Sequence, residues 1–145
     1  MINGLAIRIR SNRQALLGSL GLVGCGFVVV LASLTGLAQG WLNAFAFMVL
    51  VGLGMYIPYV TFHTTIFERF IATFREPGNI GYLMYLADAA GYLGYVAILL
   101  IRDFGNVKMD FLTLFIHSST LIAIVSFAVT IMLVAYYSRR LPKDA

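Results

Sequence analysis

One carboxylate stands inside a segment that is otherwise apolar, small or aromatic. Asp88 lies within the run GYLMYLADAAGYLG, residues 81–94. A charged carboxylate at the centre of a membrane helix costs about 2.5–3.5 kcal/mol on insertion scales, so it should face protein or water and not lipid. At about 100° per residue, it shares a helix face with Tyr85, Tyr92 and Tyr95. We expect either a functional proton or substrate site here, or a structural carboxylate bonded to tyrosine hydroxyls.

His63 is the partner that the sequence offers to this carboxylate. It lies five residues before Glu68, on a face that also carries Tyr59, and Asp88 lies eight residues after Ile80. At about 1.5 Å per residue, the two side chains sit roughly 8 and 12 Å from one membrane boundary if their helices are antiparallel neighbours. Histidine changes charge near neutral pH. Together these groups predict a proton relay at the seam between the two helices.

Other chemistry is not indicated. The second histidine, His117, falls in the outer half of the last apolar segment, and we expect it to be a packing histidine. A single cysteine rules out an intramolecular disulfide. Motifs of zinc proteases, serine hydrolases and phosphate-binding loops are absent from the sequence. We therefore predict no enzyme activity, no cofactor and no metal.

The composition is that of a membrane protein. The chain has 145 residues, of which 61% are hydrophobic without counting glycine, whereas soluble globular chains reach about 45–50% with glycine included. Charged residues make up 11% and are clustered, so the net charge of +4 does not form the basic, aromatic-interleaved face of a nucleic-acid-binding protein. The lipid bilayer is the expected partner, and nucleic acid is not.

Four segments are long and apolar enough to span a bilayer, which needs about 20 residues each: about 15–38, 42–66, 80–101 and 111–137. They leave a short N-terminal segment, 1–14, and a tail, 138–145. Of the ten Lys and Arg residues, three precede the first span, two separate the second from the third, and three follow the fourth. The positive-inside rule therefore places both termini in the cytoplasm. We predict an all-α, antiparallel bundle of four transmembrane helices.

A secretory signal peptide is the alternative for the N-terminus, because small residues occur around positions 36–38. The apolar stretch before them is longer than the roughly 7–15 residues of a signal peptide core. We expect a retained span.

Small residues spaced three or four apart mark helix contacts in membranes, where close packing drives association. Such pairs are Gly21 with Cys25, Ala87 with Gly91, and Ala90 with Gly94. They predict packing faces on the first and third helices.

Pro58 lies inside the second span, where its missing N–H predicts a bend that is either a packing kink or a hinge. At the inner end, Glu68 and Arg69 would form an interfacial gate in a carrier. Because adjacent residues point about 100° apart on a helix, we expect these two residues and Arg75 to act in topology and lipid headgroup contact.

Residues 56–100 resemble an uncharacterised family of bacterial membrane proteins that is distantly similar to the major facilitator superfamily. The resemblance rests on Phe67-Glu68-Arg69, the turn at 75–79, and Tyr85-Leu86-Ala87-Asp88 followed by GYLG at 91–94. It implies a bacterial inner membrane location and part of a major-facilitator-like fold, but no activity or substrate.

Carriers of that superfamily have about twelve spans in two halves that rock against each other. A four-span chain therefore implies a C-terminal fragment or a unit completed by a second copy or another protein. MINGLAIRIRSNRQ resembles an inter-helix loop with a start methionine, which favours the fragment. We expect a transporter-like protein, with proton-coupled transport of a small solute as the function; the alternatives are a structural or assembly module and an inactive remnant.

Overall fold

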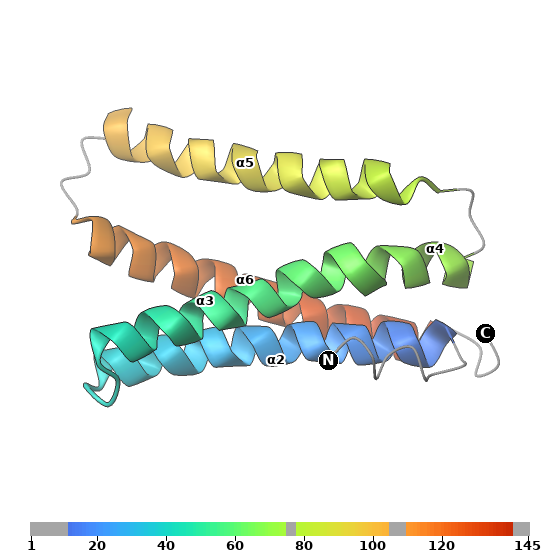
Figure 1. Ribbon diagram of the computed structural model, residues 1–145, viewed down its shortest axis with the longest axis horizontal. Coiled ribbons are helices and arrows are strands. Elements are labelled where there is room, and N and C mark those ends of the chain that lie inside the picture. Colours follow the sequence, from blue (N-terminus) through green and yellow to red (C-terminus); the bar gives the residue numbers. More distant parts are fainter. Residues whose placement is uncertain (1–11, 75–77, 105–109, 141–145) are drawn as a thin grey trace.

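The computed structural model describes residues 12–74, 78–104 and 110–140, and within these ranges the chain is helical with no strand (Figure 1). The first long helix is α2 (Asn12–Ala38). The next continuous helix is made of α3 (Ala44–Thr61), the π-helical turn η1 (Phe62–Ile66) and α4 (Phe67–Phe74). Two long helices follow, α5 (Ile80–Phe104) and α6 (Phe111–Arg140).

Four helices of 25 to 30 residues are long and apolar enough to cross a membrane: Gln14–Ala38, Ala44–Thr73, Ile80–Phe104 and Phe111–Arg139. Consecutive spans run in opposite directions (Figure 1). The all-α fold with four candidate spans is thus confirmed, and these features suggest a multi-pass membrane protein. The second span is longer than the 42–66 expected, because the helix continues past Ile66 through α4.

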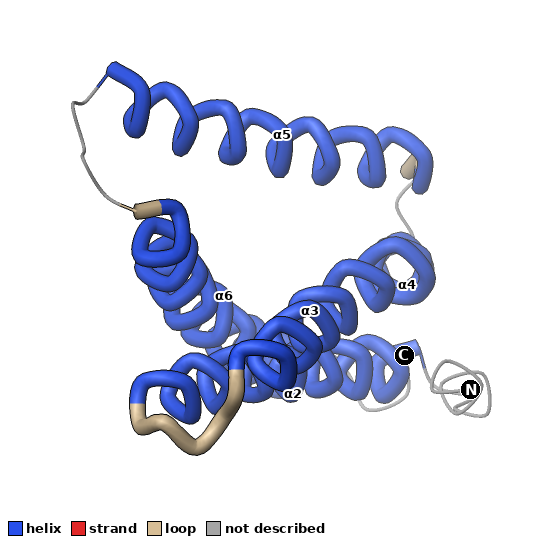
Figure 2. Tube along the Cα trace, turned by 60° about the vertical axis from the view of Figure 1, so that its left-hand side comes forward, coloured by secondary structure: helices blue, strands red, loops and turns tan. Residues whose placement is uncertain are grey.

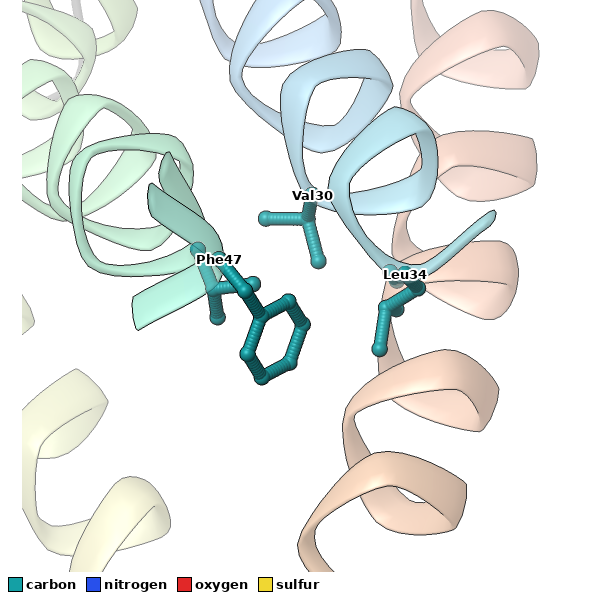
Figure 3. Packing of buried hydrophobic residues seen from close by; sticks show 5 residues of the cluster. Val30, Leu34 and Phe47 are labelled. Atoms are coloured by element: carbon teal, nitrogen blue, oxygen red, sulfur yellow. The ribbon is translucent and has the colours of Figure 1, made fainter. Parts of the chain in front are cut away.

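The packed core lies around α2, which contacts α3 on one side and α6 on the other. Val30 and Leu34 of α2 meet Phe47 of α3 in one cluster of buried side chains, which Ala123 of α6 also joins (Figure 3). A second cluster, nearer the start of α2, brings Ile66 of η1 against Leu16, Leu20 and Val23. Since lipid is as apolar as these side chains, close packing holds the three helices together.

Glycines bring α2 and α3 into backbone contact. A Cβ built on Gly54 would lie 2.9 Å from the carbonyl oxygen of Gly26 and 2.7 Å from Val30 Cγ2. A Cβ on Gly26 would lie 2.8 Å from the Gly54 carbonyl oxygen and 2.6 Å from Pro58 Cδ. No side chain fits at either position without moving a backbone. Pro58 is buried, and its ring packs against Gly26 in this contact.

The turn between these two helices follows the local sequence. Gly40 has a φ of +74°, a conformation that favours glycine. Asn43 then caps α3, since its side-chain oxygen accepts a hydrogen bond from the Ala46 N–H at 2.8 Å.

The irregularity expected at Pro58 lies just after it, in η1. The Phe67 N–H donates to the Phe62 carbonyl, five residues earlier, which is the pattern of a π-turn. Two hydroxyls compete nearby for backbone acceptors: Thr61 Oγ1 donates to Ile57 and Thr64 Oγ1 donates to Val60, both at 2.7 Å. The hinge role of Pro58 stays a prediction.

The helix α5 stands apart from the other long helices in both views (Figures 1 and 2). None of its described residues is buried. The predicted packing residues Ala87, Ala90, Gly91 and Gly94 are accordingly exposed, and on α2 so are Gly21 and Cys25. A Cβ on Gly21, Gly91 or Gly94 would meet nothing within 4 Å. Within the described chain, the close helix contact is made by Gly26 and Gly54 instead; packing of the predicted pairs against further helices stays a prediction.

Replacing Gly54 with alanine should destabilise the helix pair, because the added methyl group meets a carbonyl oxygen and the backbone of α2. Overpacking of this kind costs about 1–3 kcal/mol. The measurement is thermal unfolding in mild detergent. The matched control is Gly21→Ala on the open face of α2, which should leave the unfolding temperature unchanged or raise it. Equal unfolding temperatures for the two variants would contradict the close contact.

Candidate functional site

The structure brings His63 and Asp88 together at the seam between η1 and α5. Nε2 of His63 lies 3.1 Å from Oδ1 of Asp88. The side chain of His63 is 19% exposed and that of Asp88 41% exposed. The π-turn holds the histidine, and the antiparallel course of α5 sets the carboxylate at the same level. The contact agrees with the similar depths that the sequence predicts for these two side chains. The role of the pair stays a prediction.

The second ring nitrogen of His63 fixes the protonation pattern. Nδ1 lies 3.0 Å from the carbonyl oxygen of Tyr59, and a carbonyl oxygen can only accept a hydrogen bond. Nδ1 therefore carries a hydrogen and donates it. Nε2 is left to face the carboxyl group of Asp88.

Two forms of the pair satisfy this geometry. In one, a protonated Nε2 donates to the Asp88 carboxylate; in the other, the Asp88 carboxylic acid donates to a neutral Nε2. Each form holds one proton between the two atoms and has no net charge. Loss of that proton leaves one negative charge and turns a nitrogen lone pair toward a carboxylate, which is disfavoured in apolar surroundings. The pair can therefore hold one exchangeable proton.

Aromatic side chains surround the pair. The rings of Tyr59 and His63 have centroids 4.3 Å apart, and Tyr56 continues the row at 6.5 Å from Tyr59. A cavity of about 510 Å³ opens beside the pair. We call it the His63–Asp88 cavity, and its lining residues are Tyr59, Phe62, His63, Ala87, Asp88, Gly91, Tyr92 and Tyr95.

Of the residues predicted for this site, Tyr59, Tyr92 and Tyr95 line the cavity, whereas Tyr85 is exposed on α5 and is not among the described lining residues. Sequence reasoning placed Ala87 and Gly91 in helix packing, but they form part of the cavity wall. It missed Phe62. Phe62 directly precedes His63 at the start of the π-turn. Helical periodicity alone does not indicate that it faces the same cavity as His63.

The other predicted residues lie elsewhere. Glu68 is exposed and Arg69 half-buried on α4, and Arg75 falls outside the described residues. His117 is exposed on α6, where its Nδ1 is 2.8 Å from the Thr113 carbonyl oxygen. Within the described ranges, no three His, Cys, Asp or Glu side chains gather into a group that could hold a metal ion.

The model of a family described as a family of unknown function, DUF5690, matches residues 1–140. No curated protein and no solved structure matches the chain.

Replacing Asp88 with asparagine should change the imidazole NMR signals of His63 and leave those of His117 unchanged, because only His63 contacts this carboxyl group. The chain has two histidines, so histidine-selective 15N labelling resolves both. The exposed His117 serves as the internal control for the fold. A spectrum in which the two histidines respond alike, or neither responds, would show that the contact is absent.

Proposed function

The chain belongs to the DUF5690 family, a family of unknown function, and we propose that it is a transporter-like membrane protein whose His63–Asp88 pair takes up and releases a proton. The observation that carries this proposal is the 3.1 Å contact between an imidazole and a carboxyl group on two helices that are each able to span a membrane. Intramembrane ionisable residues that pair with each other are typical of proton relays and coupling sites.

The location of the pair supports a binding role. It opens on a cavity of about 510 Å³, which is in the range of small-molecule sites. A proton on the pair changes the charge of this cavity by one unit. Binding of a charged solute would then depend on the proton, which is the basic requirement of coupled transport. We propose no catalytic step at this site.

The arrangement of α5 supports a larger assembly. None of its described residues is buried, although its face carries the carboxylate. We propose that further helices complete the site, either from a second copy or from another segment, as the resemblance to the major facilitator superfamily implies. The resemblance to bacterial membrane proteins leads us to propose a bacterial inner membrane location, and the distribution of Lys and Arg leads us to propose that both termini are cytoplasmic.

The test is solute flux in liposomes with an imposed pH gradient. Purified protein should accumulate a solute when the gradient is present, and Asp88→Asn should abolish the dependence on the gradient, because the variant cannot share the proton. His117→Gln is the matched control, since this histidine lies exposed on α6, and it should transport like the parent. Full gradient-driven flux in Asp88→Asn would overturn the coupling role.

A structural or assembly module is the second candidate, and the uncovered face of α5 favours it. In that case the pair locks α5 to η1 and another membrane protein covers the face. Asp88→Asn would then lower thermal stability or complex formation, with no flux in any variant. An inactive remnant would show neither flux nor a partner in mild detergent.

A further inference from the structure

The chemistry of the cavity wall points to a ligand class, and we propose that the His63–Asp88 cavity binds an organic cation, a substituted ammonium group with apolar substituents, in exchange for the proton of the pair. The inference rests on the proposed proton site and goes further, because it names what replaces the proton.

Charge is the first argument. Asp88 is the one acid among the described residues that line the cavity, and no Lys or Arg is found among them. The remaining titratable groups there are the phenols of Tyr59 and Tyr92 together with that of Tyr95. Once the pair has lost its proton, the cavity holds one negative charge. A cation restores neutrality; an anion would meet repulsion from the carboxylate.

Aromatic rings are the second argument. Four of the lining residues are Tyr or Phe, from both helices of the seam. Aromatic side chains attract cations through the negative face of the ring, and aromatic cages are a recurrent way of recognising alkylated ammonium groups. Tyr92 and Tyr95 are 73% and 61% exposed, so their rings are available to a ligand.

The chemistry of the wall also favours an organic cation over a metal ion. Calcium takes about six to eight oxygen ligands and magnesium needs octahedral oxygen coordination. The cavity offers one carboxyl group, one imidazole and phenols, and the rest of its described wall is apolar. Ala87 and Gly91 leave room beside the carboxylate for the substituents of an ammonium group.

The exchange balances in charge and protons. The protonated pair is neutral and holds one proton. Entry of one monovalent cation beside the Asp88 carboxylate releases that proton to water and leaves a neutral His63, so the occupied site is again neutral. Affinity for the cation therefore rises with pH, because fewer protons compete for the site.

The experiment is isothermal titration calorimetry on the purified full chain in nanodiscs, with benzyltrimethylammonium as the probe. This cation keeps its charge at every pH, so any pH dependence belongs to the protein. Titration in two buffers of different ionisation enthalpy counts the protons released. We expect up to one proton per cation bound. Asp88→Asn should weaken binding by about tenfold or more, as expected for loss of a charged partner.

Two further variants separate recognition from folding. Tyr92→Leu, at an exposed position, should weaken binding several-fold, while Tyr92→Phe, which keeps the ring, should bind much as the parent does. His63→Gln should remove most of the proton release. The neutral analogue neopentylbenzene, which has the same shape, should bind more weakly than the cation.

Equal affinity for the cation and its neutral analogue, or binding without proton release, would overturn the inference. This result is distinguishable from failure of the carrier. Cation binding with proton release but no flux in liposomes supports the binding site and counts against transport. Gradient-driven flux of another solute with no cation binding supports transport and counts against the ligand class.

Discussion

A carboxyl group in a helix that crosses lipid must have a partner, and the arrangement of this chain supplies one. Asp88 meets the Nε2 atom of His63 at 3.1 Å, while Nδ1 of the same ring is held by the Tyr59 carbonyl. The imidazole is thus fixed at both nitrogens. Nδ1 bonds to the backbone of the helix that carries the ring, and Nε2 contacts the side chain on α5. This contact gives the carboxyl group a polar partner, which a charged group away from water needs.

A rigid platform supports the histidine. The backbones of α2 and α3 touch at Gly26 and Gly54, and buried Pro58 closes the contact one turn before the π-turn. Side chains of η1 point to two different environments. Ile66 packs into the core beside Leu16, while His63 faces the seam with α5. π-turns are rare, but those that occur inside α-helices are frequently found at functional sites. Here the π-turn follows Pro58 and Thr61 and contains Thr64, and the hydroxyls of the two threonines donate to backbone carbonyls.

The sequence was sufficient for the four apolar helices and for the meeting of His63 with Asp88, because both depend on length, hydrophobicity and the fixed rise of a helix. It was not sufficient for the glycine contacts. Gly21, Cys25 and Gly26 are all small residues of α2, and only the point at which α2 crosses α3 decides which of them meets Gly54. The π-turn was missed for a related reason: an extra residue in one turn leaves no trace in hydrophobic periodicity. The wall role of Ala87 and Gly91 depends on how far α5 stands from its neighbours, and local sequence does not encode this distance.

The isolation of α5 also bears on how the protein reaches the membrane. Among the four candidate spans, α5 has the lowest mean hydropathy, and none of its described residues is buried. The helix that enters lipid least readily by itself therefore receives the least cover from the described chain. In chain order η1 and its histidine precede α5, so the partner of the Asp88 carboxyl group is synthesised before the carboxyl group itself. The contact with His63 thus gives the carboxyl group of α5 a polar partner from the preceding span.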